Sequence, residues 1–543
     1  MDLILTGGVV WGGDAEGAPA ARAATGATAL AIRGGTIAAI GDDATIKATA
    51  TRATRQIALG GALVLPGLMD AHGHVRGLGE RLATVDVRGA RRIEAVVESV
   101  RRRAATTPPG RWITGGGWDQ NLWPGGAFPD HRPLDAAAPG IPVYLRRIDS
   151  HAAWASRAAL AAAGIDRATP DPAGGRIERD AAGDPTGILI DNAMPLVERA
   201  RPARTRDEIR AYVAQALERC AAAGLTAVHD AGVSIEEAEV FGALADEGSL
   251  PIRVYLMWDG TGPASIDAML ERAPFVGRGG RLTHRAVKLM VDGAMGSRGA
   301  VFFDDYADAP GVRGLFVTAP AEIERRAVQA MRRGYQVATH AIGDRGVHEV
   351  VGAYERALAA VRPGAGVRFE PRLRIEHVQC ARVEDLARAR RLGVIASMQP
   401  SHATSDMGWA VDRVGAARAG MLYAWRTVAG AGLTIAGGSD FPIDPETPLL
   451  GLHAAVTRQD RTGRPAGGWH PEERLTIEEA VDAYTRGAAY AAFEEHEAGR
   501  VAPGFRADLT VLDEDLRRIP PERIHAVPVR GTIVGGQIVY DRF

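Results

Sequence analysis

The sequence predicts an α/β protein, a (β/α)8 TIM barrel with a small composite β-sandwich domain formed by both termini and an insertion after barrel strand 1. Three observations favour this architecture. Short apolar runs alternate with helical patterns from about residue 205 onward, histidine or aspartate residues follow many of these runs, and both chain ends show strand-like runs with glycine turns. A doubly wound sheet is the alternative, and it explains the positions of the polar residues less well.

Composition limits the functional classes. The chain has 543 residues, a formal net charge of −2, 46% hydrophobic and 24% charged residues, and two cysteines. This balance predicts neither nucleic-acid nor membrane-surface binding, and the cysteines are too few for a disulfide framework or a cysteine-based zinc site. Because the sequence shows no basic leader and no membrane-spanning apolar run, we expect a cytoplasmic protein that binds a small-molecule substrate. A homodimer is left open.

The N-terminal segment, residues 2–10 and 28–41, reads as short strands. An apolar run then leads from Leu63 to His72-Gly73-His74. Side chains two apart in a strand point to the same side, so both imidazoles can face one point. Such a pair is half of a metal site, although His-x-His alone is a weak signal.

A helix is expected at 92–105, followed by an insertion at about 106–200 that is rich in Pro, Gly and Ala. The regular alternation then begins. Helices are expected at 206–223, 265–273, 320–333, 347–361, 383–391 and 414–429. Strands are expected at 225–228, 252–257, 286–291, 336–339, 373–376, 394–398 and 433–436. With the strand before His72, these are the eight strands that a barrel requires.

The C-terminal segment shows an amphipathic helical pattern at 476–493 and returns to strand-like runs at 499–513 and 529–540. Both chain ends therefore consist of short strand-like runs separated by glycine turns. We predict a composite β-sandwich domain from 1–62 and 495–543, and a metal-dependent barrel from 63–494.

The ends of the predicted barrel strands carry polar residues. Because these ends converge at one mouth of a barrel, we expect the side chains to form one site. The residues are His72, His74, His229, Asp230, His340, His377 and Asp440. Four of the imidazoles, those of His72, His74, His340 and His377, together with Asp440 overfill one tetrahedral ion and suit two divalent ions of the zinc type.

Lys288 is the candidate for the bridge between two such cations, which need an anionic group between them. Among 64 Lys+Arg, only Lys47 and Lys288 are lysines, and Lys288 lies in an apolar run. A buried lysine of lowered pKa can react with CO2 to form a carbamate, which arginine cannot do. The alternative is an unmodified Lys288 beside a single ion.

Several motifs resemble the amidohydrolase superfamily, and within it the YtcJ-like group (amidohydrolase family 3), which includes N-substituted formamide deformylases. The matching stretches are PGLMDAHGH, KLMVDGAMGSRGA, ATHAIGD, RIEHVQ, GGSDFPIDP and GRVAPGFRADLTVLD. The resemblance implies that His72, His74 and Asp440 hold one ion, that His340 and His377 hold the other, and that carbamylated Lys288 bridges them.

The resemblance also implies that the stretches with Trp118 and His151 lie over the active-site mouth. Gly299 and the stretch FFDDYAD depart from the family pattern on the substrate side. The resemblance therefore does not specify the substrate.

These residues predict a metal-dependent hydrolase that cleaves a C–N bond of an amide, formamide or cyclic amide. Metal-activated hydroxide would attack the carbonyl, with Asp440 as general acid/base. Trp118, His151 and His229 are weaker candidates for substrate binding; Trp118 also fits a core residue, and His229 a core or supporting histidine. The alternatives are an esterase, lactonase or deaminase at the same site and, less favoured, a non-catalytic binding or regulatory protein.

Overall fold

The computed structural model describes residues 1–12, 26–148, 152–172, 175–261, 265–361 and 370–543. It divides into two compact units. We call Met1–Val75 with Ala216–Phe543 the barrel unit, and Arg76–Gln215 the insertion unit.

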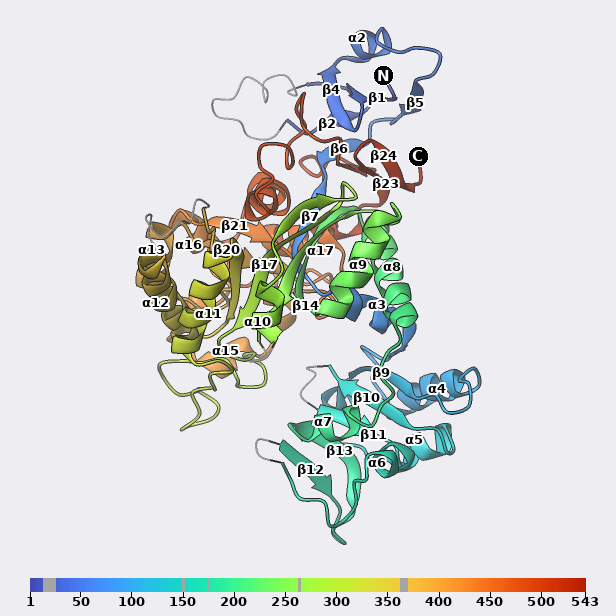
Figure 1. The fold of residues 1–543 in the computed structure, drawn as a ribbon, viewed down its shortest axis with the longest axis vertical. Helices are drawn as coiled ribbons and strands as arrows, with labels where there is room; N and C mark the ends of the chain where they lie inside the picture. The colour runs from blue at the N-terminus through green and yellow to red at the C-terminus, as the bar shows by residue number, and fades with distance from the viewer. Residues whose placement is uncertain (13–25, 149–151, 173–174, 262–264, 362–369) are drawn as a thin grey trace. The chain divides into compact units, whose positions relative to one another are not determined.

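Eight parallel strands of the described chain form the barrel, in the order β7, β14, β15, β17, β18, β19, β20, β21 (Figure 1). Their bounds are Leu68–Gly73, Leu225–Val233, Arg253–Asp259, Leu282–Met290, Gln336–Ala341, Arg374–His377, Ile395–Met398 and Thr434–Gly437. A short strand β16, Phe275–Arg278, pairs with β17. The predicted barrel is confirmed.

The barrel closes between β7 and the segment after β21. The amide of Asp440 donates to the carbonyl of His72 at 2.7 Å, and the amide of His74 donates to that of Phe441 at 2.7 Å. A Cβ on Gly73 would lie 2.5 Å from the Phe441 ring. Gly73 is therefore required so that the chain beyond β21 can lie against β7.

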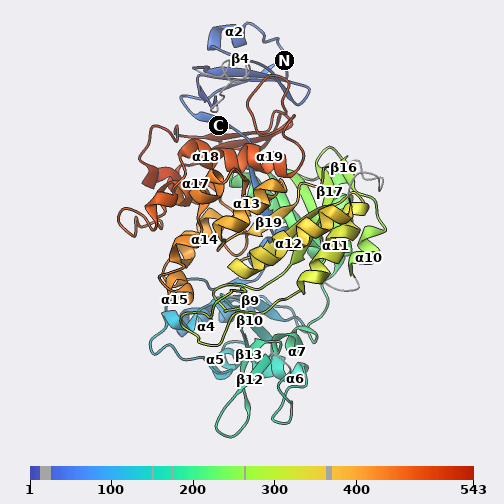
Figure 2. The same cartoon turned by 90° about the vertical axis from the view of Figure 1, so that its left-hand side faces the viewer.

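Helices follow most barrel strands, and α11, α12 and α13 lie outside the strands β17 to β19 (Figure 2). The helices of this unit after the first β-segments are α9 Ile235–Asp246, α10 Ser265–Leu270, α11 Pro320–Arg332, α12 Asp344–Ala360, α13 Val383–Arg391, α14 Pro400–Asp406, α15 Ala410–Val414, α16 Trp425–Gly430, α17 Pro448–Thr457, α18 Ile477–Asp482 and α19 Ala488–Ala491. Helix α8, Arg206–Ala222, crosses from the insertion unit into the barrel unit.

Two predicted helices differ from the structure. The helix expected at 414–429 is wrong, because α15 ends at Val414 and Gly415 has a left-handed φ of 77°. Only a 3-10 turn, Ala419–Met421, and α16 follow before β21. The helix expected at 476–493 is interrupted by a π-helical turn at Ala483–Gly487.

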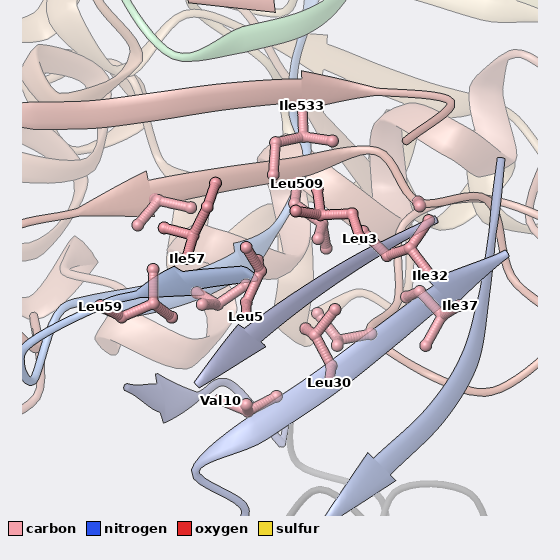
Figure 3. Close-up of a cluster of buried hydrophobic side chains, with 14 of the residues drawn as sticks. Leu3, Leu5, Val10, Leu30, Ile32, Ile37, Ile57, Leu59, Leu509 and Ile533 are labelled. Atoms are coloured by element: carbon pink, nitrogen blue, oxygen red, sulfur yellow. The ribbon is translucent and has the colours of Figure 1, made fainter. Parts of the chain in front are cut away.

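The chain ends form two small sheets. One has the order β4-β3-β1-β5 and comes from the N-terminal segment, whereas the other has the order β2-β6-β22-β23-β24 and combines both termini. Figure 3 shows leucine and isoleucine side chains of both ends packed in one core. The bounds are β1 Leu3–Thr6, β2 Val9–Val10, β3 Ala29–Arg33, β4 Thr36–Gly41, α2 Asp43–Lys47, β5 Arg55–Ala58, β6 Leu63–Pro66, β22 Leu509–Leu512, β23 Val529–Val534 and β24 Gln537–Asp541.

Strand β6 pairs with β22, so the run 63–66 belongs to the terminal sheets rather than to the barrel. The division into 1–62 with 495–543 and 63–494 remains our proposal, with its first boundary moved to residue 66. One apolar stretch, interrupted only by Gly67, supplies β6 to the terminal sheet and β7 to the barrel.

The insertion unit has a mixed sheet of order β12-β13-β11-β10-β9-β8 and includes the predicted insertion 106–200. Its elements are α3 Val75–Ala83, β8 Val85–Asp86, α4 Ile93–Ala104, β9 Ile113–Trp118, α5 Arg132–Ala137, β10 Val143–Arg147, β11 Ala152–Ala155, α6 Arg157–Ala162, β12 Gly175–Arg179, β13 Pro185–Asp191 and α7 Met194–Glu198. Among all described helices, none combines the length and the apolar character needed to traverse a bilayer.

Candidate metal centre

The barrel brings together His72, His74 and Asp440. His72 lies in β7, His74 follows it, and Asp440 follows β21. One carboxylate oxygen of Asp440, Oδ1, lies 3.0 Å from Nε2 of His74 and 3.6 Å from Nε2 of His72. Asp440 has a φ of 57°, a left-handed conformation that is uncommon outside glycine and often found at functional sites, although Asp tolerates it better than most residues.

The hydrogen bond made by Nδ1 of His74 fixes which ring nitrogen bears the proton. Nδ1 lies 2.8 Å from the carbonyl oxygen of Ala231, so Nδ1–H donates. In the neutral ring, the lone pair of Nε2 then faces the Asp440 carboxylate. Two acceptors at 3.0 Å repel unless a cation lies between them. That cation is either a proton or a metal ion. Binding of a proton is favoured because Asp440 raises the pKa of His74 against the effect of burial.

His72 is fixed in the same way. Its Nδ1 donates to Oε2 of Glu376 at 2.5 Å, and Nε2 faces Nζ of Lys288 at 3.0 Å. The ring is fully buried, and burial together with Lys288 lowers the pKa of His72 to about 4. His72 is therefore neutral near pH 7, the form that ligates metals.

His377, at the end of β19, has the same tautomer. Its Nδ1 donates to Oε1 of Gln399 at 2.8 Å, and the amide nitrogen of Gln399 donates to the carbonyl of Ser397. Burial, followed by the charge of His340, holds the pKa of His377 well below its usual range. The ring of His340, from β18, lies 4.5 Å from that of His377, centroid to centroid.

A buried ion-pair network supports these rings. Arg374 donates to both oxygens of Glu376, to the carbonyl of Ala71 and, at 3.1 Å, to Nδ1 of His229. Burial opposes ionisation of Glu376, yet Arg374 and His72 hold its pKa well below the usual range. Such partners orient metal ligands and increase their basicity.

The predicted site residues are thus placed as follows. Lys288 is buried in β17, and burial lowers its pKa. His229 is 1% exposed and accepts from Arg374, which favours the supporting role over a substrate contact. Trp118 is 0% exposed in the core of the insertion unit, where its Nε1 donates to the carbonyl of Leu145. His151 lies outside the described residues.

Among the described residues, two groups have ligand atoms within 4.8 Å of one another: His72, His74 and Asp440, and His377, His402 and Asp440. His402 is not among the site residues that the sequence predicts. Its position four residues beyond the end of β20, at the barrel mouth, is the signal that could have identified it. Asp440 Oδ1 is buried without a hydrogen-bond partner, as expected of a metal-ligating oxygen. The donor set of imidazoles and a carboxylate fits a zinc-type cation.

Comparison with known proteins agrees with this geometry. The profile described as "Amidohydrolase family" matches residues 55–540. The chain is 33% identical over 498 residues to YtcJ of Bacillus subtilis (strain 168), whose name places it among the amidohydrolases, with 90% of this chain and 91% of that protein covered. It is 29% identical over 536 residues to the N-substituted formamide deformylase of Arthrobacter pascens, with 95% of each chain covered.

A solved structure of an uncharacterized metal-dependent hydrolase from Pyrococcus horikoshii OT3 has 27% sequence identity and a TM-score of 0.77, covering 96% of this chain and 99% of that one. The fold, the cluster of histidines at the barrel mouth and these relatives lead to one conclusion. The chain belongs to the amidohydrolase family and is a metal-dependent hydrolase.

Proposed function

We propose that this enzyme hydrolyses a C–N bond of an amide, formamide or cyclic amide, with Asp440 as the general acid and base. The observation that supports it best is the convergence of the Nε2 lone pairs of His72 and His74 and the carboxylate of Asp440 at the barrel mouth. The name of the deformylase relative supports C–N chemistry.

His72, His74 and Asp440 would hold one divalent ion, with zinc as the preferred metal. His340 and His377 would hold a second, and Lys288, as a carbamate, would bridge the two. When bound, such ions lower the pKa of a water molecule to near neutrality and polarise the scissile carbonyl. Lys288 is suited to this role because it is buried and its Nζ already lies 3.0 Å from His72 Nε2.

Asp440 moves the proton. Oδ1 of Asp440 faces the imidazoles, and Oδ2 lies on the side of His402. Oδ1 can therefore stay at the metal-binding position while Oδ2 takes up a proton from the attacking water. Release of that proton to the leaving nitrogen completes the cleavage to a carboxylic acid and an amine. His229 accepts a hydrogen bond from Arg374, which binds Glu376, so its role is to position the ligands rather than to contact substrate.

The test is turnover by the purified enzyme of a formamide (formanilide), a cyclic amide (glutarimide) and an ester (phenyl acetate). Amide cleavage with little ester cleavage is expected. Asp440→Asn should reduce kcat by at least about 1,000-fold with the circular dichroism spectrum unchanged. Asp412→Asn, on an exposed position of α15, is the matched control.

The other outcomes distinguish the alternatives. Ester cleavage alone would favour an esterase, and ammonia release from aminated ring compounds would favour a deaminase. Full function of Asp440→Asn would contradict hydrolysis.

A further inference from the structure

His402 is a buried polar residue beside the metal centre that the proposed chemistry does not use. It lies on α14, is 6% exposed, and its ring stacks against that of His377 at a centroid distance of 6.2 Å. Its Nε2 lies 3.9 Å from Oδ2 of Asp440 and 3.9 Å from Oδ2 of Asp444. Within the described residues, this nitrogen has no hydrogen-bond partner.

The tautomer of His402 is the opposite of that of the metal-facing histidines. Its Nδ1 lies 3.1 Å from the amide nitrogen of Gln379, which can only donate. Nδ1 therefore accepts, and the proton of the neutral ring is on Nε2. The spacing of His377, His402 and Asp440 would suit an ion, but an Nε2–H group is a hydrogen-bond donor and not a ligand. His402 thus presents a donor to the barrel mouth.

Asp444 presents the matching acceptor. Its side chain is 14% exposed, and its Oδ2 is buried without a hydrogen-bond partner among the described residues. A second nearby carboxylate, that of Asp406, differs because it accepts a hydrogen bond of 2.5 Å from the hydroxyl of Tyr423. His402 Nε2–H and Asp444 Oδ2 are therefore a donor and an acceptor that are both buried and without a partner among the described residues. They lie 3.9 Å apart, which is too far for a direct hydrogen bond.

This spacing fits an amide group. The oxygen and nitrogen of one amide are about 2.3 Å apart by standard bond lengths, so both can lie within hydrogen-bond distance of a pair 3.9 Å apart. The N–H and C=O must then point to the same side. Cyclic amides, imides and primary amides meet this condition, whereas open-chain trans amides, N-methylated amides and esters do not.

We propose, on the basis of the amide hydrolysis proposed above, that His402 and Asp444 form a substrate-recognition pair that selects amides with N–H and C=O on one side. His402 Nε2–H donates to the carbonyl oxygen, and Asp444 accepts from the N–H. Among the amide classes given above, the preferred substrates are therefore cyclic amides and imides and primary amides.

The test compares glutarimide with N-methylglutarimide, using the metal-loaded enzyme. The wild type should favour glutarimide by about 10- to 100-fold in kcat/KM, because the methylated ring leaves the buried carboxylate unpaired. Asp444→Leu, which removes the acceptor without making room for a methyl group, should lose this preference by lowering kcat/KM for glutarimide alone. Asp406→Asn is the matched control and should keep the preference, because an amide oxygen still accepts from Tyr423.

His402 is tested by metal content as well as by rate. His402→Leu should lower kcat/KM for both rings by about 10-fold or more while the metal bound per chain stays at the wild-type value. His402→Gln, which keeps an N–H near the same point, should recover part of the loss. Loss of metal from His402→Leu would show that His402 is a ligand and would overturn the proposal.

Equal treatment of the two rings by the wild type, in turnover or in equilibrium binding measured by calorimetry, would also overturn the pair. So would a preference for acetanilide, an open-chain trans amide, over glutarimide. Binding that favours glutarimide over its N-methyl derivative without turnover of any amide would instead contradict the proposed function and leave the recognition pair standing. Retention of the glutarimide preference by Asp444→Leu would exclude Asp444 as the acceptor.

Discussion

The carboxylate of Glu376 decides which nitrogen of His72 faces Lys288 and Asp440. Because Glu376 accepts from Nδ1 of His72, the lone pair of Nε2 is directed into the site. Ala231 does the same for His74 through a backbone carbonyl, and Gln399 does it for His377. Three different acceptors on three different strands or loops thus impose one tautomer. In each neutral ring, this tautomer leaves the Nε2 lone pair free to bind a metal ion.

Glu376→Gln tests this orientation. The amide oxygen can still accept from His72, but the negative charge that increases the basicity of the ring is lost. We expect metal affinity, measured by competition with a chelating dye, to fall by about 10- to 100-fold. Glu355→Gln, which removes a surface partner of Arg388, should leave metal affinity unchanged. Unchanged affinity in Glu376→Gln would show that this pair does not tune the ligand.

Five of the side chains proposed for the metal centre were predicted from the sequence alone, because each lies at or just beyond the end of a strand that the sequence pattern predicts. Alternation and apolar runs locate the strand ends, and the barrel then brings His72, His74, His340, His377 and Asp440 together. His402 and Asp444 follow the last two strands in a short helix and a loop, where no periodicity marks them. The role proposed for them rests on an N–H group and a carboxylate oxygen without hydrogen-bond partners among the described residues, which only the tertiary structure reveals.

Strand β17, one of the barrel strands, carries both a residue of the site and a buried residue of the core. Lys288 faces the site from this strand, whereas His284 is buried against Trp258 at a ring distance of 3.9 Å. Burial, together with the charge of Arg272, lowers the pKa of His284 to about 3. The strand predicted at 286–291 begins four residues later than β17 and leaves out His284. Periodicity could not show that this histidine would pack inside the protein, because the neighbouring residues come from other strands and helices.

The lowered pKa of His284 predicts a pH dependence of stability. Below pH 6.5 the unfolded chain gains a proton that the folded protein does not accept until about pH 3, so stability falls as the pH is lowered through this window. At pH 5 the cost is about 2 kcal/mol. His284→Leu should remove this share of the pH dependence in urea unfolding followed by tryptophan fluorescence. His496→Leu, at an exposed ring, should not; equal slopes in the wild type and His284→Leu would contradict the assignment.

Glycines show where prediction of elements failed. The pattern at 414–429 is apolar enough for one helix, yet the left-handed φ of Gly415 ends α15, and Tyr423, with φ of 51°, turns the chain again before α16. Backbone conformations of this kind are set by the contacts of the folded chain. They are therefore missed when a sequence is read by periodicity.

In the barrel unit as a whole, the terminal sheets are joined to the barrel by buried hydrogen bonds. The hydroxyl of Thr510, on β22, accepts from the amide of Leu68 at 3.0 Å and donates to the carbonyl of Gly224 at 2.7 Å. One side chain from the C-terminal segment thus contacts the beginning of β7, the strand that carries His72, and the residue before β14. The strand-like runs at both chain ends predicted the composite sheets, but not the hydrogen bonds of Thr510 that join them to the barrel.

Thr510→Val removes both hydrogen bonds with almost no change of shape. An amide and a carbonyl are then left buried without partners, so we expect a loss of about 2–4 kcal/mol in the free energy of unfolding. Thr106→Val, which removes a hydroxyl on an exposed turn after α4, should cost less than about 0.5 kcal/mol. Equal stability of the two variants in urea unfolding would show that Thr510 is not an important link.

Metal-dependent hydrolysis is tested by the metal content of the purified enzyme, measured by elemental mass spectrometry together with activity before and after chelation. We predict about two equivalents of a zinc-type ion per chain, with a labile carbamate mass on Lys288. We also predict less metal in His74→Phe and recovery of activity when metal is restored. An enzyme that is free of metal and fully active would contradict metal-dependent hydrolysis, because oriented lone pairs alone cannot generate the nucleophile.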